Sequence, residues 1–194
     1  MSKAGLTTRR GSRRADWIDH DSMSHVLAAL MPPNRLAVEI AMVTRLRISD
    51  VLNIKTEQIM PHNGAKSSPC RITVRQLKTG KSIRVYIPRE LREQMLLIAG
   101  RKYVFEGRSD WRKHRTRQAI AKDLERARKI LRIPRLVISA HTARKIWAVD
   151  RYKETGGDLR KVQRELGHTD PTITAIYAMA DTLTQRKLGR KLGG

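Results

Sequence analysis

The sequence has few of the features that mark secreted or membrane proteins. Its single cysteine, Cys70, excludes a disulfide within the chain. No apolar run approaches the roughly 20 residues that a membrane-spanning helix needs, and the N-terminus lacks the apolar stretch of a signal peptide. These absences predict a cytoplasmic protein without a membrane anchor. We interpret Cys70 as a buried thiol with no part in the chemistry.

Acidic and aromatic residues are also scarce. Only 18 Asp and Glu stand against 41 Lys and Arg, which leaves a formal net charge of +23, and aromatic residues make up 4% of the chain. Leu, Ile, Val, Ala and Met must therefore fill the core. The positive charges repel one another in the folded state, and a nucleic acid relieves this repulsion while releasing its own counterions. Ribosomal and chromatin proteins share such a charge, so it indicates a class of partner and no activity.

Hydrophobic periodicity predicts an α+β fold that is mainly helical, with one small antiparallel sheet. Two alternating segments at 71–77 and 82–88 are typical of a β-hairpin that turns around Thr79 and Gly80. Helices are expected near 22–31, 34–46, 88–100, 113–132, 140–154, 158–166 and 171–180, with a short helical turn at 48–54. The expected N-caps include Asp21 or Ser22, then Asn34, Ser49 and Ser139.

The two ends of the chain differ in composition from its middle. Residues 1–18 are basic and lack hydrophobic periodicity, which predicts a disordered arm. Residues 19–180 contain the periodic segments and are expected to form a single domain. Residues 181–194 form a basic tail that contains Leu183, Leu188 and Leu192.

The segment "SAHTARKIW" at 139–147 is the first candidate for chemistry. If Ser139 caps a helix, His141 lies in its first turn and Arg144 lies one turn later on the same face. An imidazole and a guanidinium at a helix N-terminus form an anion site, because their N–H groups and the helix dipole act in the same direction. A His near a helix start also serves as an ordinary cap or surface residue, so the pair alone is a weak indication.

Three further segments contain candidate residues. In "LGHTDPTITAIY", Gly167 ends one helix, His168 follows it, and Tyr177 comes late in the next helix. Arg47 stands at the junction of a long and a short helix, where a cation also suits the helix dipole. Lys78 stands at the tip of the hairpin, where a solvated turn residue is equally expected.

Taken together, these segments resemble the tyrosine recombinase (phage integrase) family. Its catalytic domain carries, in chain order, the residue types found here as Arg47, Lys78, His141, Arg144, His168 and Tyr177. The resemblance runs from about residue 20 to 180. It implies an α+β catalytic domain at 19–180 in which a small antiparallel hairpin packs on a helical core.

The resemblance also implies a reaction. The Tyr177 hydroxyl would attack a DNA phosphodiester and form a 3′-phosphotyrosine, which releases a 5′-hydroxyl. Arg47 and Arg144 would hold the non-bridging oxygens, and Lys78 would protonate the leaving oxygen. His141 would take or return the tyrosine proton, and His168 would donate a hydrogen bond to the phosphate. No metal or other cofactor is required, because cationic side chains take the role that metal ions have in nucleases.

The expected partners are double-stranded DNA and further copies of the chain, in a dimer or tetramer on DNA. In the family, the segment after the tyrosine often packs on a neighbouring protomer, although a flexible basic tail is an equal expectation here. Contacts to the DNA backbone are expected from cationic side chains around the site and along the 113–132 helix. They are Arg45, Lys81, Arg112, Lys113, Arg115, Arg117, Lys122 and Lys145.

Some residues depart from the family pattern, and two other functions stay open. The family usually has Gly at the position of Arg45, Leu at that of Ala143 and often His at that of Lys145. Most members also have a separate DNA-binding domain before the catalytic one, where this sequence has about twenty residues. A type IB topoisomerase has a similar active site, and a DNA-binding regulator could retain the fold. The complete set of reactive residues favours a site-specific recombinase over both.

Overall fold

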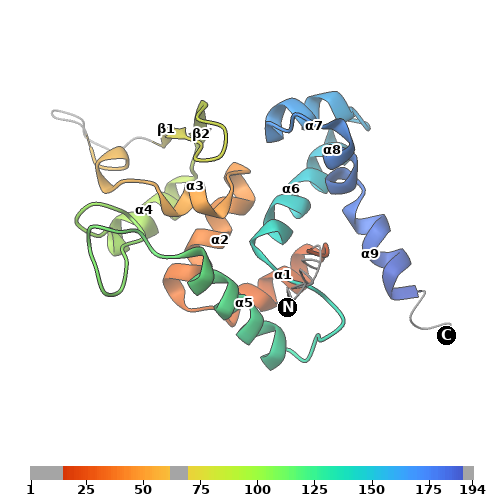
Figure 1. Ribbon diagram of the computed structural model, residues 1–194, viewed down its shortest axis with the longest axis horizontal. Coiled ribbons are helices and arrows are strands. Elements are labelled where there is room, and N and C mark those ends of the chain that lie inside the picture. Colours follow the sequence, from red (N-terminus) through yellow and green to blue (C-terminus); the bar gives the residue numbers. More distant parts are fainter. Residues whose placement is uncertain (1–14, 62–69, 190–194) are drawn as a thin grey trace, which may run out of the picture.

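The computed structural model describes residues 15–61 and 70–189, and within these ranges the chain is mainly helical with one two-stranded sheet (Figure 1). The expected α+β class is therefore confirmed. The elements are α1 (His20–Ala28), α2 (Pro32–Thr44), α3 (Ile48–Leu52), the 3-10 helix η1 (Thr56–Gln58), β1 (Arg71–Arg75), β2 (Ser82–Tyr86), α4 (Arg89–Ile98), α5 (Arg117–Ile130), α6 (Ala140–Glu154), α7 (Leu159–Leu166), α8 (Pro171–Ala178) and α9 (Ala180–Gly189).

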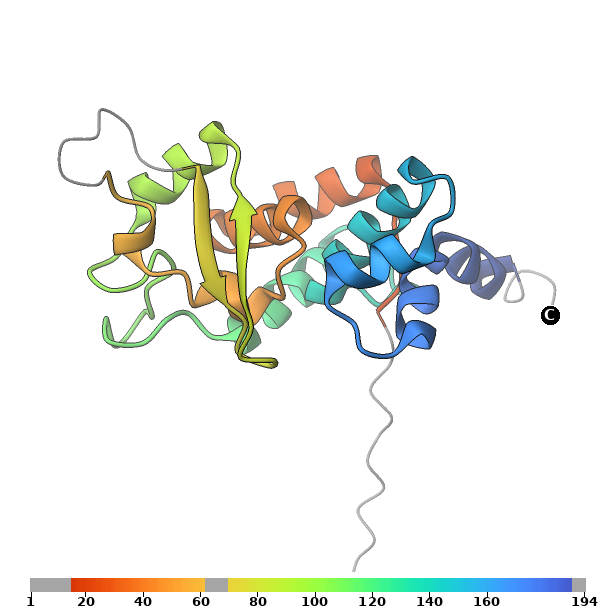
Figure 2. The same cartoon turned by 90° about the horizontal axis from the view of Figure 1, so that it is seen from above.

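The two strands form the expected antiparallel hairpin. Ile72 pairs with Val85 and Val74 with Ile83, so alternate side chains enter the core while their neighbours face solvent. Gly80 has a φ of +68°, a value that Gly adopts without steric cost, and its N–H donates to the Gln76 carbonyl to close the turn. The tip of this turn stands clear of the helices (Figure 2).

The core has two parts, and α6 belongs to both. The larger part gathers buried side chains from α1 to α6 and from the hairpin, including Ile40, Leu124 and Ile146. The smaller part joins Ala148 of α6 to Val162 and Leu166 of α7. Figures 1 and 2 show α7, α8 and α9 on the opposite side of α6 from the hairpin. The first turns of α6, with Ala143 and Ile146, pack in the larger part, and Ala148 packs in the smaller one.

Several helices begin at other residues than predicted, because other side chains and backbone geometries start them. Asp19, rather than Asp21 or Ser22, caps α1 by accepting the Ser22 N–H at 2.8 Å. Pro32 begins α2, which is preceded by Met31 rather than by an Asn34 cap. Arg47, not Ser49, is the residue before α3.

The long basic helix is shorter than predicted. It begins at Arg117 instead of 113 because the Thr116 hydroxyl accepts the Ala119 N–H at 3.1 Å and ends the preceding loop. By contrast, Ser139 caps α6 as predicted, and its side chain accepts the His141 N–H at 3.2 Å.

Residues 15–18, which were expected in the arm, belong to the folded part. The N–H of Asp16 donates to the Val137 carbonyl, and the N–H of Val137 donates to the Asp16 carboxylate, both at 2.8 Å. Ile18 is buried. The physical reason is that Asp16 and Ile18 find partners far away in sequence, which composition alone does not reveal. Residues 1–14 of the predicted arm lie outside the described residues.

The predicted tail is helical through residue 189, because α9 continues from α8 after the single residue Met179. The N–H of Trp17 donates to the Thr184 hydroxyl at 3.0 Å, and Lys187 forms an ion pair with Asp16. The segment before α1 and the helix after α8 therefore hold each other. Residues 190–194 lie outside the described part. None of the described helices is both long and apolar enough to cross a membrane.

A buried carboxylate joins α5 to the start of α2. Asp123 accepts hydrogen bonds from the Met31 N–H (2.8 Å), from the Asn34 amide (2.7 Å) and from Arg126 (2.7 Å). Burial opposes ionisation of this carboxyl, but the hydrogen bonds from Asn34, Met31 and Arg126 together outweigh it and keep the pKa of Asp123 below its ordinary value. Asp123 is therefore expected to stabilise the fold as a carboxylate.

We expect Asp123→Asn to lower the free energy of unfolding by about 2 kcal/mol at neutral pH, since a charged acceptor is lost among buried donors. Urea denaturation would measure this. Because the folded-state pKa is depressed, the contribution is present above the ordinary Asp pKa and is lost as the pH falls through the folded value. The difference between wild type and variant should therefore shrink in acid. The exposed Glu57→Gln serves as the control, with an expected change below about 0.5 kcal/mol. Equal stability of Asp123→Asn and wild type would contradict the assignment.

Candidate active site

A small pocket lies where α3, α5 and α6 begin. Its lining residues are Arg47, Ile48, Ser49, Arg117, Ala140, His141 and Arg144. Its volume is small, about 40 Å³. Such a pocket has room for an oxygen of a larger anion and not for a whole metabolite. Arg47 and Arg144, which are 97 positions apart by their numbers, thus meet at one spot.

Arg144 is held in place by the protein backbone. The residue is 2% exposed, and its guanidinium donates to the carbonyls of Arg45 and, at 3.1 Å, of Leu166. Burial and the neighbouring charge of Arg47 lower the pKa of Arg144 to about 10, so it remains a cation at neutral pH. Neither carbonyl neutralises this charge.

Arg47 has an unsatisfied donor. Its Nη1 is buried and has no hydrogen-bond partner among the described residues. A buried guanidinium nitrogen without an acceptor is unfavourable unless a ligand supplies one. The nearby Asp50 is buried, and one of its oxygens accepts the Leu77 N–H at 2.9 Å while the other has no partner in the described part of the chain. Asp50 therefore joins the hairpin to this site without forming a paired salt bridge with either arginine.

Tyr177 reaches the site from α8. Its hydroxyl forms a hydrogen bond of 2.9 Å with Nδ1 of His141, and its ring meets the His168 ring edge-to-face at a centroid distance of 5.1 Å. Burial raises the pKa of Tyr177, although the charges of Arg144 and Arg47 act in the opposite direction. The phenol is therefore protonated at neutral pH and has an imidazole in position to accept its proton.

Both imidazoles at the site favour the neutral form. Loss of water around the ring and the charges of Arg144 and Arg47 lower the pKa of His141. The same two causes, with a smaller contribution from Lys78, lower the pKa of His168 to about 4. Nδ1 of His168 lies 3.2 Å from the hydroxyl of Thr174, a fully buried residue of α8. If that hydroxyl is the donor, the proton of His168 resides on Nε2.

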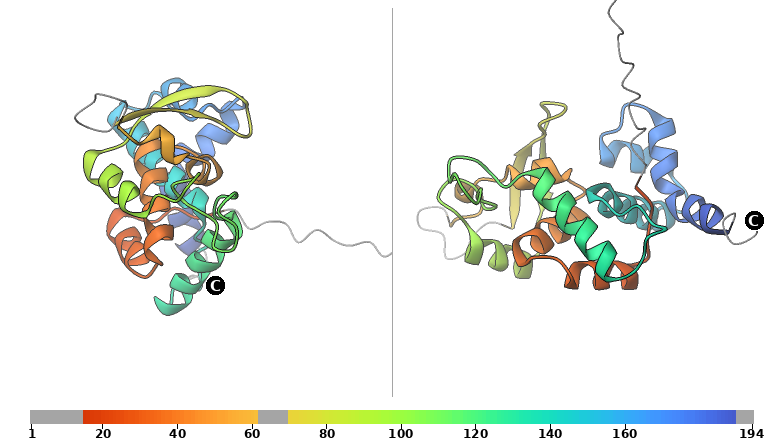
Figure 3. Two further views of the ribbon diagram at one scale, coloured as in Figure 1. Left: turned by 90° about the vertical axis from the view of Figure 1, so that its left-hand side faces the viewer. Right: turned by 60° about the horizontal axis from the view of Figure 1, so that its bottom comes forward.

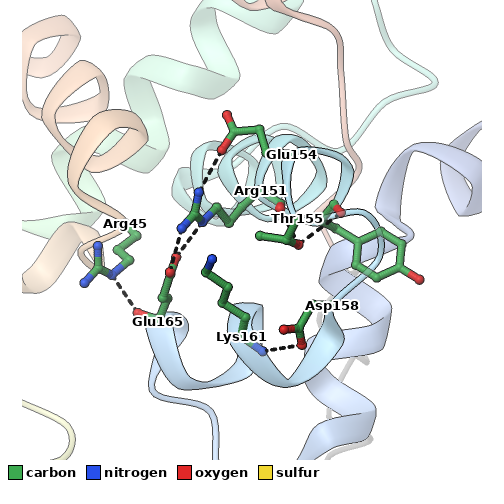
Figure 4. Close-up of polar contacts among 8 residues, drawn as sticks. Arg45, Arg151, Glu154, Thr155, Asp158, Lys161 and Glu165 are labelled. Carbon is green, nitrogen blue, oxygen red and sulfur yellow. Dashed lines mark hydrogen bonds and ion pairs between the residues drawn. The ribbon is translucent and has the colours of Figure 1, made fainter.

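Ion pairs fix α7, which precedes His168, against α6 (Figure 4). Arg151 of α6 binds both oxygens of Glu165 at 2.9 Å and also pairs with Glu154 at 3.0 Å. A two-pronged arginine–carboxylate pair fixes orientation as well as distance. Gly167 then ends α7 with a φ of +64°, as predicted, and His168 follows directly. The position of His168 therefore depends on the packing of α7 on α6.

Arg45 was expected to contact DNA, and in the structure its side chain contacts other parts of the protein. It ends α2 with a φ of +58°, a left-handed conformation that Gly adopts without strain, and Gly is the usual residue here in the family that the sequence resembles. Its Nε donates to the Glu165 carbonyl at 2.6 Å (Figure 4), and its guanidinium lies 5.7 Å from the centre of the Trp147 ring. Arg45 thus connects α2 to α6 and α7.

Lys145 was also expected to contact DNA, but it is buried. Its side chain is only 7% exposed, and its Nζ donates to the Ala15 carbonyl at 2.6 Å. Arg115 is half-buried as well, and it donates to the Asn34 side chain at 3.2 Å. The DNA contacts of these two residues stay a prediction. In each case a long cationic side chain finds an acceptor that is distant in sequence.

The other expected DNA contacts are exposed. Lys81 lies at the hairpin turn, and Lys122 lies on α5. Lys78, the expected general acid, is exposed at the same turn and is not among the residues that line the pocket. Arg112 lies 4.9 Å from the centre of the Trp111 ring, and Lys113 pairs with Asp110 at 3.6 Å. Figures 2 and 3 show the loop before α5 and the hairpin turn projecting on the same side of the molecule.

The sequence did not reveal three supporting features of the site. Arg117 was expected as one of several backbone contacts, whereas it lines the pocket beside Arg144. Ser49 was expected as a cap and also lines the pocket. Thr174 had no assigned role, although its spacing of six residues from His168 in "HTDPTIT" is the signal that could have indicated it. In the described part of the chain, no group of three or more His, Cys, Asp or Glu residues is placed to hold a metal ion.

A family model described as the phage integrase family matches residues 16–183, so the chain belongs to the phage integrase family. No curated protein sequence matches it. The fold is similar to XerH site-specific recombinase bound to difH substrate, with a TM-score of 0.62 and 22% identity over 84% of this chain and 50% of that one.

Two further solved structures have a similar fold. The λ integrase (75–356) dimer bound to a COC′ core site has a TM-score of 0.63 and 21% identity over 85% of this chain and 59% of that one. The catalytic domain of bacteriophage HP1 integrase has a TM-score of 0.57 and 20% identity over 86% and 89%. The chain thus spans about half of the XerH chain, just under 60% of the λ integrase chain and most of the HP1 catalytic domain.

We expect the imidazole of His168 to stay neutral from about pH 5 to 8, because its pKa lies near 4. Nitrogen-detected NMR of the histidine side chains would measure this. Since the folded-state pKa is depressed, the unfolded chain binds a proton that the folded chain does not, and this site reduces stability as the pH falls below the ordinary His value. Arg47→Gln removes one neighbouring charge and should raise the His168 midpoint. A wild-type midpoint near the ordinary value would show that the arginines and His168 are not clustered.

Proposed function

We propose that this protein is a site-specific DNA recombinase that cuts and rejoins DNA through a 3′-phosphotyrosine intermediate. The observation that carries the proposal is the hydrogen bond between Tyr177 and His141 beside a pocket lined by Arg47 and Arg144. A nucleophile, a proton acceptor and two cations for a phosphate are thereby grouped within one site. Membership of the phage integrase family supports the same reading.

In the proposed first step, the Tyr177 oxygen forms a bond to the scissile phosphorus and the bond from phosphorus to the 5′-oxygen breaks. The phenolic proton passes to Nδ1 of His141, which already contacts the hydroxyl. The low pKa of His141 leaves it neutral and able to accept that proton. Lys78 would donate a proton to the departing 5′-oxygen. Rejoining reverses these transfers with a 5′-hydroxyl as the nucleophile.

The two arginines would bind the non-bridging oxygens of the phosphate. Charge on these oxygens must be accommodated in the transition state, and a planar guanidinium binds two of them at once. Arg144 is preorganised by its two carbonyl acceptors, whereas the unsatisfied Nη1 of Arg47 is available to the phosphate. Arg117, at the start of α5, would bind the same phosphate or the next one. The Nε2 proton of neutral His168 would add a further hydrogen bond.

Double-stranded DNA is the proposed substrate, and a dimer or tetramer on DNA is the proposed assembly. The net charge of +23 supports DNA binding. XerH is bound to its difH substrate, and λ integrase is bound to DNA and forms a dimer on a core site. We extend both features to this chain. The exposed cations Lys81, Arg112, Lys113 and Lys122 would contact the DNA backbone. The proposed location is the cytoplasm, in association with DNA, and residues 16–183 would form the catalytic domain.

Tyr177→Phe should abolish the covalent protein–DNA adduct that resists SDS on a nicked duplex, because phenylalanine has no oxygen to form the ester. DNA affinity should stay within about twofold, since the hydroxyl does not contribute to electrostatic binding. Gel electrophoresis in SDS with labelled DNA would detect the adduct, and filter binding would give the affinity. Adduct formation by the variant would reject Tyr177 as the nucleophile. Absence of an adduct with the wild type on trapped substrates would favour a DNA-binding regulator, and relaxation of supercoils without paired sites would favour a type IB topoisomerase.

Arg47→Gln should lower the rate of adduct formation at least about 100-fold, the usual loss when one preorganised oxyanion donor is removed. Its thermal stability should remain close to that of the wild type, because Nη1 of Arg47 has no protein partner among the described residues. The matched variant Arg144→Gln loses two backbone acceptors and should lower both rate and stability. Rapid-quench kinetics and thermal denaturation measure the two effects. An Arg47→Gln protein that cleaves at the wild-type rate would exclude Arg47 from the phosphate site.

A further inference from the structure

Lys145 brings three distant parts of the chain together. It follows Arg144 on α6, and its Nζ donates to the carbonyl of Ala15, in the segment before α1. The same Nζ lies 5.7 Å from the centre of the Tyr177 ring on α8. A buried amine therefore contacts the N-terminal segment and the face of the candidate nucleophile at the same time.

The Tyr177 side chain is held from three directions. His141 binds its hydroxyl at 2.9 Å, His168 packs against its ring at 5.1 Å, and Lys145 lies over its ring. A cation over a desolvated aromatic face is attracted by the ring quadrupole. The two imidazoles come from the first turn of α6 and from the residue after α7, and Lys145 is the contact that also reaches the N-terminal segment.

The N-terminal segment is anchored at the first turn of α6. The Thr142 hydroxyl donates to the Asp16 carbonyl at 3.0 Å, and the Asp16 carboxylate accepts the Val137 N–H at 2.8 Å and pairs with Lys187 of α9. Thr142 also completes the cap of α6, because its hydroxyl accepts the Ser139 N–H at 3.2 Å. The position of the Ala15 carbonyl is thus set by the helix that carries His141 and Arg144.

We infer that Lys145 is a positioning residue for the nucleophile: anchored on the Ala15 carbonyl, its ammonium keeps the Tyr177 ring where the hydroxyl reaches His141. This inference rests on the proposed function. It assigns Lys145 a role through the tyrosine and not through DNA. It also means that the N-terminal segment acts on the site, because displacement of Ala15 withdraws an acceptor that fixes the ammonium.

The test compares Lys145→Met with Lys145→Arg in the full 194-residue chain, using a nicked duplex under single-turnover conditions. Lys145→Met keeps most of the side-chain volume without the charge. We expect it to lower the rate of adduct formation at saturating DNA about tenfold, the equivalent of a cation–π contact of ordinary strength. The Kd for DNA should stay within about twofold, and Lys145→Arg should recover most of the rate because the charge returns. If Lys145→Met fails to fold, Lys145→Gln replaces it, because glutamine keeps a donor for the Ala15 carbonyl but has no charge. The same loss of rate is expected for this variant.

Lys187→Met is the matched control, since Lys187 forms an ion pair with Asp16 in the same segment, and no contact between Lys187 and Tyr177 is found in the described part of the chain. It should retain the wild-type rate at saturation, because the hydrogen bonds of Asp16 with Val137 and Thr142 still hold the segment in place. An equal loss of rate in Lys187→Met would overturn the inference, because anchoring of the segment alone would then explain the effect. Weaker DNA binding with an unchanged saturating rate in Lys145→Met would overturn it in favour of a DNA contact.

A measurement that needs no reaction separates this inference from the proposed function. With ¹³C-labelled tyrosine, Tyr177→Phe identifies the Tyr177 ring signals among the four tyrosines. These signals should shift in Lys145→Met and stay in place in Lys187→Met. Unchanged ring signals in Lys145→Met would reject the positioning role even if the wild type forms the adduct. A clear shift without any wild-type adduct would uphold the positioning role and reject the proposed reaction.

Discussion

Two guanidinium groups held together without a paired carboxylate are the constraint on which this structure depends. Arg144 is buried between the carbonyls of Arg45 and Leu166, and Arg47 lies beside it with an unsatisfied nitrogen. Like charges in a poorly hydrated site repel each other strongly. The fold tolerates this because backbone dipoles, which have no net charge, hold one guanidinium in place. The remaining positive potential is then free to attract an anion.

The electrostatics of the neighbouring groups follow from that pair. Burial and the same two arginines keep His141 and His168 neutral, while Tyr177 stays protonated because burial outweighs their attraction for the phenolate. A bound phosphate would bring negative charge to the pocket and weaken the effect of the arginines on each group. The imidazoles would then accept protons more readily. Without a bound anion, the excess positive charge of the site therefore keeps both imidazoles neutral.

The geometry is maintained by contacts that are remote in sequence. The Arg151–Glu165 pair and the Arg45 guanidinium hold α7, and through it His168, against the first part of the site. The segment at Ala15 and Asp16 is fixed to α6 and α9. Two of these contacts, Arg151–Glu165 and Lys145–Ala15, start from α6, which belongs to both parts of the core. The positions of the reactive groups therefore depend on how the other segments pack around α6.

Much of this could be predicted from the sequence, because it depends on local rules. Alternating residues specified the hairpin, Ser139 specified the start of α6, and Gly167 specified the end of α7, since strand pleating, capping and left-handed backbone each act within a few residues. The order of reactive residue types also identified the family. The sequence could not show which cationic side chains face solvent and which bind acceptors within the protein. Arg45, Arg115 and Lys145 have the same charge and reach as residues expected on DNA, yet carbonyl or amide oxygens from distant segments bind them. The sequence by itself determined the elements and the chemical groups, whereas only the tertiary structure decided which charges face a ligand, because a long cationic side chain takes whichever acceptor the packing brings within its reach.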